Sequence, residues 1–400
     1  MGHDPMQPLC LAYAAGPGDV VRTFAHWQRG EDDPHQVAMT YSGQFFDVCR
    51  RIGARGVVLS SCSRADRLKT EQFHVENLPK GSTLRGLGFH LQQIGYVRKV
   101  VNQALSHGAD LLVMADATGH FFPLQWFAPR HMGLVPSLHC TLWPKFRPPS
   151  RLQTIINRLN RFLFRHRAAA ILCLSRDIEK QVRMVSSQDP RPIVPFIPTY
   201  RTSVFDRLSD PPDQPPFNLL YAGRMEPEKG IFDLLQMAID LKQAGQTHIH
   251  LHLCGDGSRE ADLRQAADRA GVENTFHIHG YCYKPQMQAH IFRSHALVVP
   301  STTAFGEGFN KVVVEGVLAG RPVITSSICP ALEVVADAVV EVAPDDPDGY
   351  RRAALRLAAD QSLYDAKRRA CRRLQAQFYD PVRSWGSALS QAIERWADDR

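Results

Sequence analysis

The sequence has 400 residues, of which 44% are hydrophobic and 22% are charged. This apolar content excludes a disordered chain, and the length suits two domains that each bury their own core. The 47 Lys and Arg residues against 40 Asp and Glu give a formal net charge of +7. We expect this mild positive charge to suit an anionic substrate or an acidic membrane surface. We do not expect nucleic-acid binding, which would call for a clustered stripe of basic residues.

Nine cysteines are scattered along the chain without a C-x-x-C pair, so we expect reduced thiols and a cytoplasmic protein. The N-terminus lacks the charged and apolar regions of a signal peptide. No apolar run approaches the roughly 18 residues that span a bilayer. We therefore expect a chain in the cytoplasm, at most peripheral on the inner face of the membrane.

Short apolar runs alternate with segments of helical periodicity, which is typical of parallel sheets covered by helices. In the first half of the chain we expect strands at 9–14, 56–60, 110–115, 134–139 and 170–175. Helices are expected between them at 44–52, 89–106, 151–165 and 177–186. The apolar content of these strand runs indicates burial on both faces.

Residues 188–217 interrupt the alternation with eight prolines, which do not fit a central strand or a helix interior. Beyond them we expect strands at 218–222, 248–254, 275–279, 296–299, 322–326 and 339–342. Helices are expected at 230–244, 259–270, 284–293, 308–319, 348–359, 362–378 and 381–397.

This order predicts two doubly wound, Rossmann-like α/β domains that face a cleft. We expect the first at 1–197, a proline-rich hinge at 198–216, the second at 217–379, and a C-terminal helix within 380–400 that crosses back to the first. In such sheets ligands bind at the carboxyl ends of the strands. We therefore search the strand ends for the site.

The loop Gly223-Arg224-Met225-Glu226-Pro227-Glu228-Lys229-Gly230 directly follows the strand expected at 218–222. Glycine permits a sharp turn and close backbone approach, and Arg224 and Lys229 bring two cations to the strand end. With a helix beginning at Gly230, such a loop is suited to a diphosphate. An ordinary solvated turn with surface charges is the alternative.

Two shorter glycine motifs follow the next strands of the second domain. Gly255-Asp256-Gly257 indicates a turn and a backbone wall beside a ligand, although most such triplets are only turns. His279-Gly280 ends the following strand. In a chain with 17 histidines, a structural role for His279 is the simpler interpretation when the residue is taken alone.

The segment from Phe305 to Glu315 carries the strongest signal, because two glutamates flank the start of an expected helix. A rise of ~1.5 Å per residue predicts a separation of roughly 12 Å along the helix axis between Glu307 and Glu315. That distance matches the reach of a nucleotide sugar from its sugar ring to its ribose, and each carboxylate can accept hydrogen bonds from two hydroxyls. We expect the phosphates to face the first backbone N–H groups of the helix, those of Gly308, Phe309 and Asn310. A capped surface helix with two ordinary glutamates is the alternative.

In order and spacing, these four motifs resemble the retaining glycosyltransferases of family 4, also called group 1, which have the GT-B fold. The resemblance is specific from about residue 218 to 360 and extends to the helix of Trp385, while over 1–187 it is mostly architectural. It implies that Arg224 and Lys229 neutralise the donor diphosphate. It also implies that Glu307 lies near the transferred sugar and that Glu315 holds the ribose hydroxyls.

The resemblance implies a retaining enzyme that moves a hexose-like sugar from a nucleotide-diphosphate sugar to a glycan or lipid-linked hydroxyl, in polysaccharide or glycolipid assembly. The family generally works without a metal, so we expect no cofactor and no metal ligands. The predicted catalytic residues are Arg224, Lys229, Glu307 and His120. The predicted donor-binding residues are Gly223, Gly255, Asp256, Gly257, His279, Gly308, Phe309, Asn310 and Glu315. A nucleotide-sugar epimerase of the same fold and a non-catalytic two-domain sugar-binding protein are the alternatives.

Polar residues at strand ends of the first domain form the predicted acceptor side: Gly16, Gly18, Asp116 and His139, together with His120. Family members commonly carry a polar histidine facing the cleft at the positions of His120 and His139. Because the donor phosphate serves as the base in a front-face retaining reaction, we expect His120 to position the acceptor or the sugar. Histidines hydrogen-bonded inside the fold are an equally open interpretation.

Three histidines, His248, His250 and His252, alternate along one expected strand and therefore share a face. A metal site is one interpretation of this pattern. We favour the simpler one, a parallel strand covered by a helix.

The segment 145–167 is basic, with Lys145 and several arginines and no acid. It also carries an apolar stripe at helical spacing: Leu152, Ile155, Ile156, Leu159, Phe162 and Leu163. We expect this stripe to pack on the sheet. The alternative is a basic amphipathic helix that lies on an anionic membrane and brings a lipid-linked acceptor within reach.

Overall fold

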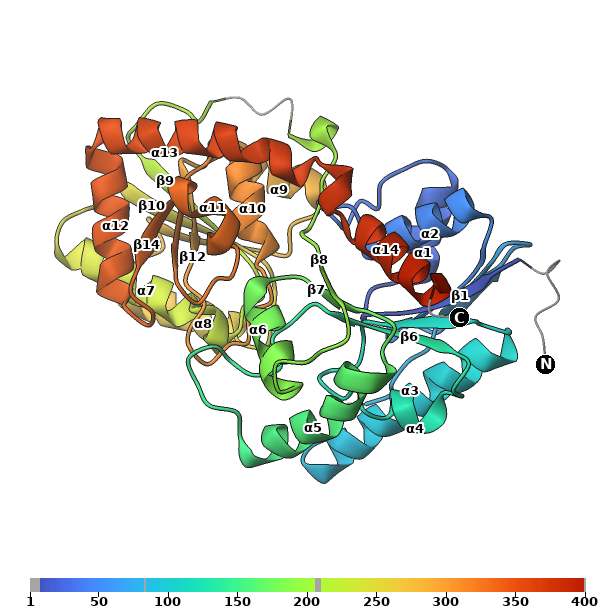
Figure 1. Ribbon diagram of the computed structural model, residues 1–400. Coiled ribbons are helices and arrows are strands. Elements are labelled where there is room, and N and C mark those ends of the chain that lie inside the picture. The colour runs from blue at the N-terminus through green and yellow to red at the C-terminus, as the bar shows by residue number, and fades with distance from the viewer. Residues whose placement is uncertain (1–7, 83, 206–209, 399–400) are drawn as a thin grey trace. The chain divides into compact units, whose positions relative to one another are not determined.

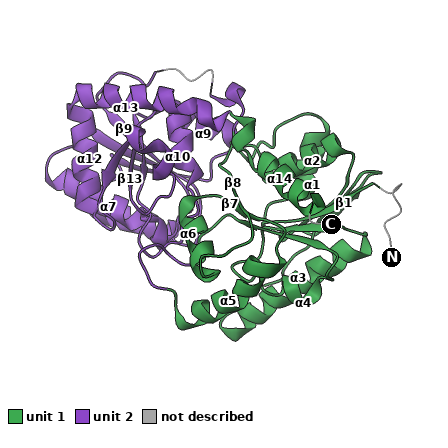
Figure 2. Cartoon of the chain, viewed as in Figure 1, with its two compact units in different colours: residues 1–142, 149–199, 380–400 green, residues 143–148, 200–379 purple. Residues whose placement is uncertain are grey.

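The computed structural model describes residues 8–82, 84–205 and 210–398, which fall into two compact units (Figures 1 and 2). Unit 1 comprises residues 1–142, 149–199 and 380–400, and unit 2 comprises residues 143–148 and 200–379. The expected hinge at 198–216 is divided between the units at Tyr200, and its residues 206–209 lie outside the described residues. The assignment of Trp143–Pro148 to unit 2 has no counterpart in the sequence analysis.

Unit 1 is built on a sheet with the strand order β3-β4-β2-β1-β5-β6-β7-β8 among the described residues. Neighbouring strands are parallel, except that β3 runs antiparallel to β4. The central strands are buried along their whole length, as in a parallel sheet covered on both faces. The strands are β1 (Cys10–Ala15), β2 (Arg55–Ser60), β3 (Asp66–Lys69), β4 (Phe73–Asn77), β5 (Leu111–Met114), β6 (Gly133–Leu138), β7 (Ile171–Cys173) and β8 (Ile193–Pro195).

Three of these strands were not predicted, and all three lie toward the edges of the sheet. The outermost strand β3 is mostly charged and exposed, so it shows no apolar run, and β4 beside it buries only alternate residues. At the opposite edge, β8 uses Pro195 from the proline-rich stretch. An edge strand tolerates proline because one of its sides needs no N–H donors.

The helices of unit 1 include the C-terminal helix of the chain, which packs on α2. There Gly386 N donates a hydrogen bond of 2.8 Å to Gln44 Oε1, and Trp385 Nε1 donates one of 2.9 Å to Ser137 Oγ. The helices are α1 (Val20–Gln28), α2 (Tyr41–Ile52), α3 (Leu87–Ser106), α4 (Leu124–Phe127), α5 (Arg151–Phe162), which a π-helical turn continues (Leu163–Arg167), α6 (Arg176–Val185) and α14 (Trp385–Asp398). Among the described residues, no helix combines the length and the apolar character needed to cross a membrane.

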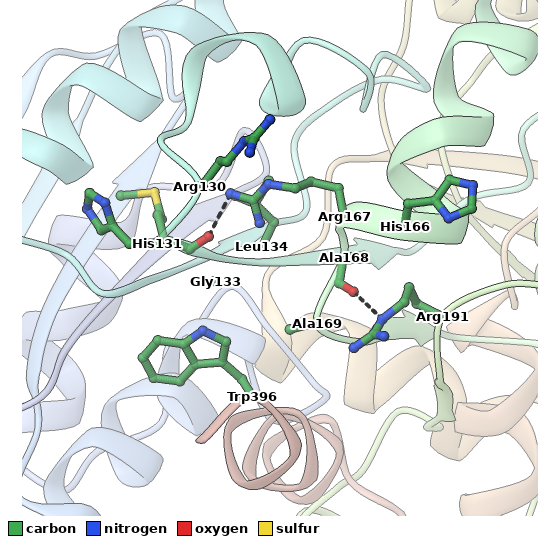
Figure 3. A pocket seen from close by; sticks show the side chains of 11 residues that line it. Arg130, His131, Gly133, Leu134, His166, Arg167, Ala168, Ala169, Arg191 and Trp396 are labelled. Carbon is green, nitrogen blue, oxygen red and sulfur yellow. Dashed lines mark hydrogen bonds between the residues drawn. The ribbon is translucent and has the colours of Figure 1, made fainter. Parts of the chain in front are cut away.

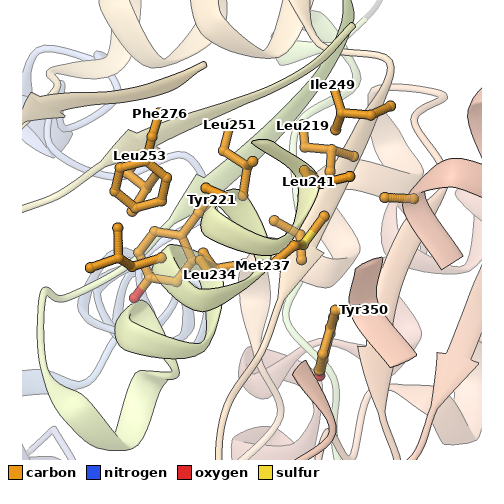
Figure 4. Packing of buried hydrophobic residues seen from close by; sticks show 14 of the residues in the cluster. Leu219, Tyr221, Leu234, Met237, Leu241, Ile249, Leu251, Leu253, Phe276 and Tyr350 are labelled. Carbon is orange, nitrogen blue, oxygen red and sulfur yellow. The ribbon is translucent and has the colours of Figure 1, made fainter. Parts of the chain in front are cut away.

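Unit 2 is built on an all-parallel sheet with the order β11-β10-β9-β12-β13-β14 among the described residues. Its core packs side chains of β9 and β10 against α7, α8 and α12 (Figure 4). The strands are β9 (Phe217–Ala222), β10 (Ile249–Cys254), β11 (Phe276–Gly280), β12 (Ala296–Val299), β13 (Val323–Ser326) and β14 (Val339–Val342). The helices are α7 (Ile231–Gln243), α8 (Glu260–Ala270), α9 (Lys284–Arg293), α10 (Lys311–Leu318), α11 (Leu332–Val335), α12 (Pro347–Ala359) and α13 (Gln361–Leu374).

The strand order of unit 2 reverses beside its central strand. From β9 the chain adds β10 and β11 on one side, and then it returns to place β12 on the other side of β9. In open α/β sheets the carboxyl ends of the strands at such a reversal are the usual ligand site. The loops that follow β9 and β12 are those that carry Lys229 and Glu307.

Candidate active site

The loop after β9 is held between the loops that follow β10 and β12. On one side, Met225 N donates a hydrogen bond of 2.7 Å to the carbonyl of Asp256. On the other side, Thr302 N donates one of 3.0 Å to the carbonyl of Glu228. The three strand ends therefore form one hydrogen-bonded layer at the carboxyl edge of the sheet.

Glycines permit this close packing of the loops. A Cβ on Gly255, whose φ is +142°, would lie 1.8 Å from the carbonyl oxygen of Gly223. A Cβ on Gly257 would lie 2.5 Å from the carbonyl oxygen of Met225, and one on Gly230 would lie 2.0 Å from that of Pro300. Gly255-Asp256-Gly257 therefore forms an irregular segment, followed by a turn at 258–259, and the close approach of neighbouring backbone accounts for its two glycines. A role for these residues, and for the exposed Asp256, in donor binding stays a prediction.

Lys229 and Glu307 form an ion pair within this layer. Lys229 Nζ lies 3.0 Å from Glu307 Oε2, and the two side chains are only 16% and 9% exposed. Ser301 Oγ at 3.3 Å and Asn310 Nδ2 at 3.1 Å donate hydrogen bonds to the same oxygen. These three bonds fix the orientation of a carboxylate at the point where the strand order reverses.

The ring of Phe305 lies beside both cations of the site. Lys229 Nζ is 3.7 Å from the ring centroid, within the range of a cation–π contact, and the guanidinium carbon of Arg224 is 6.0 Å from it. Arg224 is exposed, while its carbonyl accepts a 2.7 Å hydrogen bond from Tyr221 OH. The site thus contains one cation paired with a carboxylate and a second whose head group reaches solvent.

The helix expected to begin at Gly308 begins at Lys311, with Asn310 as its N-cap. Asn310 has a φ of +70°, a left-handed conformation that asparagine tolerates better than most residues. Because Glu307 precedes the helix, the estimated axial separation from Glu315 was wrong. The N–H groups of Gly308 and Phe309 also lie outside the first turn. Phe309 is instead buried, and its carbonyl accepts a 3.1 Å hydrogen bond from Ala331 N.

Glu315 lies on α10, one turn after Lys311, and is partly buried. Its Oε1 is 3.5 Å from Tyr200 OH, a long hydrogen bond. Burial raises the pKa of Glu315 to about 7, although Lys311 and Tyr200 oppose the shift. Near neutral pH the protonated and the ionised forms of this carboxyl group are therefore both populated.

His279 contacts other histidines rather than the Lys229–Glu307 pair. Its Nε2 lies 3.0 Å from His252 Nδ1, and its ring centroid is 4.2 Å from that of His290 on α9. Gly280 has a φ of +72°, and its carbonyl accepts a 2.7 Å hydrogen bond from Gly255 N. The His279-Gly280 motif thus supports the loop after β10, and donor binding by His279 is untested by this geometry.

Residues 206–374, which cover most of unit 2, match the family model described as "Glycosyl transferases group 1". The chain carries a group 1 glycosyltransferase domain. This assignment agrees with the resemblance found in the sequence motifs, all of which lie inside the matched residues.

Curated relatives of the group 1 domain are similar over the same region. The chain is 31% identical over 168 residues to glycogen synthase from Mycobacterium tuberculosis, which covers 41% of this chain and 39% of the relative. It is 30% identical over 178 residues to O-antigen chain mannosyltransferase B from Escherichia coli, covering 44% and 45%. The matched region thus spans less than half of either relative.

The solved structures are similar over nearly the whole chain. The crystal structure of Anabaena HepE in complex with UDP has a TM-score of 0.64 at 16% identity and covers 98% of this chain and 100% of that one. At such low identity the likeness shows the fold alone, which is GT-B. The predicted pair of Rossmann-like domains is therefore confirmed, with the group 1 domain as the second.

In unit 1, outside the group 1 domain, the structure buries His120 in a local network. His120 Nδ1 lies 2.9 Å from the carbonyl oxygen of Thr118, and its Nε2 lies 2.9 Å from His90 Nδ1. Burial lowers the pKa of His120, so the ring is neutral at pH 7. The buried Asn160 holds the same loop, because its Oδ1 accepts from Phe121 N at 3.1 Å. This is the geometry of a structural histidine, and the catalytic role stays a prediction.

The other acceptor-side residues are also engaged locally. Asp116 pairs with Lys80 at 2.7 Å, and His139 Nε2 lies 2.9 Å from Ser137 Oγ. At Gly16 and Gly18, by contrast, an added Cβ would meet no atom within 4 Å. The turn of Gly16 and Gly18 therefore has free space around it, whereas the two side chains have partners.

Most of the apolar stripe on α5 faces solvent, so the expectation that it packs on the sheet was wrong there, while Leu163, in the π-helical turn that follows, is buried. Ile155 and Phe162 are 57% and 56% exposed, and Leu152 and Leu159 are exposed as well. The helix buries Asn157 and Asn160 instead. The physical reason is that Asn160 satisfies backbone groups of the loop at 119–122, which no apolar side chain can do.

A cavity of about 260 Å³ in unit 1 lies away from the strand ends considered above (Figure 3). It is lined by Arg130, Arg167 and Arg191 beside Gly133, the first residue of β6. Arg167 and Arg191 donate hydrogen bonds to backbone carbonyls there. Because the cavity borders the amino end of β6, it is not part of the predicted acceptor side.

Three residues at the site were not assigned a role by the sequence analysis. Ser301 follows β12 and was detectable as a polar residue at a strand end. Phe305 lies within the quoted motif, but nothing in the sequence shows that its ring meets Lys229. Tyr200 comes from the proline-rich stretch and carries no local signal of its contact with Glu315.

Proposed function

We propose that the chain transfers a sugar from a nucleoside diphosphate sugar to a hydroxyl acceptor, with retention of the anomeric configuration. The observation that carries this proposal is the ion pair of Lys229 and Glu307. Lys229 Nζ lies 3.0 Å from Glu307 Oε2, at the point where the strand order of unit 2 reverses. The family assignment supports it, and so does HepE, whose structures hold UDP and, in one case, UDP and glucose. A UDP-sugar is therefore the first donor to test.

The proposed site separates two tasks between its charged groups. Arg224, whose head group reaches solvent, meets the diphosphate, and Lys229 stabilises the charge that develops on the leaving phosphate. Glu307 is bonded through Oε2, so we assign its Oε1 to the hydroxyls of the transferred sugar. Glu315 accepts hydrogen bonds from the ribose.

In the proposed step, the bond between the anomeric carbon and the donor phosphate oxygen breaks, and a bond to the acceptor oxygen forms on the same face. The acceptor proton passes to the departing phosphate oxygen, so no protein base is needed. His120 and His139 would position the acceptor, together with Asp116 and the turn of Gly16 and Gly18.

We propose that the two cations take the part that a divalent ion plays in other transferases. The expected result is full turnover in EDTA, measured well below the melting temperature. Loss of turnover in EDTA that Mg²⁺ or Mn²⁺ restores would contradict this part of the proposal.

The decisive experiment compares donor binding with transfer. Thermal shift against a panel of nucleotide sugars should identify the donor, because a ligand that binds only the folded state raises the melting temperature. Turnover of that donor should then require an added hydroxyl acceptor. An epimerase would convert the donor alone, and a sugar-binding protein would show a shift without turnover.

We further propose that α5 holds the enzyme on the inner face of an anionic membrane, near a lipid-linked acceptor. The exposed residues of α5 support this proposal. The apolar side chains of Ile155 and Phe162 are exposed, and so are three arginines of the same helix, Arg151, Arg158 and Arg161.

A sedimentation experiment tests the proposal. Vesicles that contain phosphatidylglycerol should co-sediment the wild type but not the double variant Ile155→Glu/Phe162→Glu. Val382→Glu is the matched control, since Val382 is an exposed apolar residue elsewhere in unit 1. Equal sedimentation of all three proteins would contradict the proposal.

A further inference from the structure

One face of unit 2 gathers histidines and cysteines from two strands, a loop and a helix. Along β10 the core-facing residues are Ile249, Leu251 and Leu253, so the alternate residues point to the other face. That face carries His250, His252 and Cys254 from β10, His277 and His279 from the edge strand β11, Cys282 from the next loop and His290 from α9. The helix that the sequence analysis expected over the histidine strand is thus present, and it adds a histidine of its own.

Within this cluster, the ligand atoms of His252, His279 and His290 all lie within 4.8 Å of one another. His252 Nδ1 and His279 Nε2 are 3.0 Å apart. Zinc binds imidazole nitrogen at about 2.0–2.1 Å with tetrahedral geometry, which places two ligand nitrogens about 3.3 Å apart. The 3.0 Å between His252 and His279 is close to this spacing, and the nitrogen of His290 lies within 4.8 Å of both.

Asn218 determines which nitrogen of His252 is available. The amide Nδ2 of Asn218 donates a 3.1 Å hydrogen bond to the carbonyl of Arg293, so its Oδ1 faces the other way, 3.2 Å from His252 Nε2. An amide oxygen only accepts, so His252 carries its proton on Nε2 and presents a lone pair on Nδ1 toward His279. A metal-binding histidine is commonly oriented in this way, by a hydrogen bond from its other nitrogen.

We propose that His252, His279 and His290 form a Zn²⁺ site that ties α9 to β10 and the edge strand β11. His252 binds through Nδ1, and Asn218 is its positioning residue. His279 donates its Nε2 proton to His252 in the metal-free state. On binding, this proton moves to His279 Nδ1, so the lone pair on Nε2 becomes a ligand and no net proton is released.

The surroundings keep these rings uncharged at neutral pH. Burial and the neighbouring histidines lower the pKa of His252 to about 3 and that of His279 to about 4. Burial lowers the pKa of His290 as well, with Arg293 contributing. A metal binds the neutral form of imidazole, which is the form that burial favours here.

The site would add an anchor to α9, whose carbonyls at Ile291 and Arg293 already accept hydrogen bonds from Arg321 and Asn218. Among the residues of α9, Ile291 is the fully buried one. An ion shared between α9 and the two strands joins a weakly packed helix to the edge of the sheet. Zinc should therefore raise the melting temperature, and this readout does not depend on glycosyl transfer.

The experiment uses the tag-free full chain after a chelator has removed bound metal. ZnCl₂ is titrated into it in a calorimeter, and its melting temperature is measured with ZnCl₂ added. We expect one Zn²⁺ per chain and a higher melting temperature, with no effect of MgCl₂, an ion that prefers oxygen ligands. His290→Ala and His252→Ala should each weaken binding by about 100-fold or more, and Asn218→Ala by about 10- to 100-fold. His248→Ala is the matched control, since His248 is exposed beside the same strand and lies outside the three groups; it should bind as the wild type does.

Two outcomes would overturn the proposal: no Zn²⁺ binding by the wild type, or binding that His252→Ala and His290→Ala both leave unchanged. Substitution with CoCl₂ tests the choice of ligands. Cys254 and Cys282 form a second group with His290, so a sulfur-to-cobalt charge-transfer band would move the site to these cysteines. Loss of binding in His250→Ala, His277→Ala and His252→Ala, with His290→Ala unaffected, would also overturn the proposal and assign the ion to His250, His252 and His277.

Discussion

The two units differ in how they use their candidate residues. In unit 2, Lys229 and Glu307 come from loops 78 residues apart and meet at 3.0 Å where the strand order reverses. In unit 1, His120 and Asp116 are each bound to a partner close by, His90 and Lys80. The structure thus brings together side chains from two motifs of unit 2 that lie far apart in the sequence, whereas the polar residues predicted at strand ends of unit 1 pair with neighbours that the sequence analysis did not name.

The largest expected effect is on turnover, and it comes from the ion pair of Lys229 and Glu307 in unit 2. Lys229→Met and Glu307→Gln should each lower kcat by about 10²–10³-fold or more, because each removes charge stabilisation from a preorganised site. Glu341→Gln, on an exposed position of β14, is the control and should retain full turnover. Circular dichroism checks folding, and normal turnover by either variant would end the assignment.

The next effect is on stability rather than on turnover. Gly255→Ala should lower the free energy of unfolding by about 2–4 kcal/mol, because its Cβ would lie 1.8 Å from the carbonyl oxygen of Gly223 in a backbone conformation that suits glycine. Urea denaturation measures this change in the free energy of unfolding. Gly95→Ala, where an added Cβ meets open space, should cause no loss. Equal stability of the two variants would contradict the close packing of the loops.

A smaller effect is expected in unit 1. His120→Asn should raise the KM for the acceptor by about tenfold, which is the effect of losing one hydrogen bond, and should leave donor binding unchanged. His90→Asn breaks the same histidine pair from the other side and serves as the comparison. If both variants lose stability while the acceptor KM stays constant, His120 has a structural role, and the prediction that it positions the acceptor is wrong.

The smallest effect concerns Glu315. Its raised pKa of about 7 means that the carboxylate fraction rises between pH 6 and pH 8. Only the ionised form accepts hydrogen bonds on both oxygens, so the Kd for the donor nucleotide should fall several-fold as the pH rises through about 7. Glu315→Gln should bind more weakly and lack this part of the pH dependence, as calorimetry can measure. A parallel pH profile in wild type and variant would contradict the role of Glu315.

Much of the fold could be predicted because buried parallel strands leave continuous apolar runs, and all strands of unit 2 were found close to their observed bounds. The start of α10 was missed because Gly308 looks like a helix start, while the left-handed Asn310 depends on tertiary contacts. The buried face of α5 was missed for a similar reason. Periodicity gives the apolar stripe, but the partner of Asn160 is a loop some 40 residues away.

Local pattern also falls short where distant elements meet. The alternation of His250 and His252 was visible in the sequence, whereas the approach of His290 from α9 and the bond of Asn218 to His252 depend on the folded chain. The same holds for Lys229, which was predicted as one of two cations facing the diphosphate and forms an ion pair with Glu307. Residue types were predictable at these sites, and their pairing was not.

The pairing of Lys229 with Glu307 bears on how the nucleotide product leaves. Because one of the two cations is already compensated before a donor arrives, a released nucleoside diphosphate meets a weaker attraction than two uncompensated cations would exert. Product dissociation should therefore be faster in the wild type than in Glu307→Gln, which frees the lysine. In this way the carboxylate that we propose to orient the sugar would also limit inhibition by the nucleoside diphosphate product.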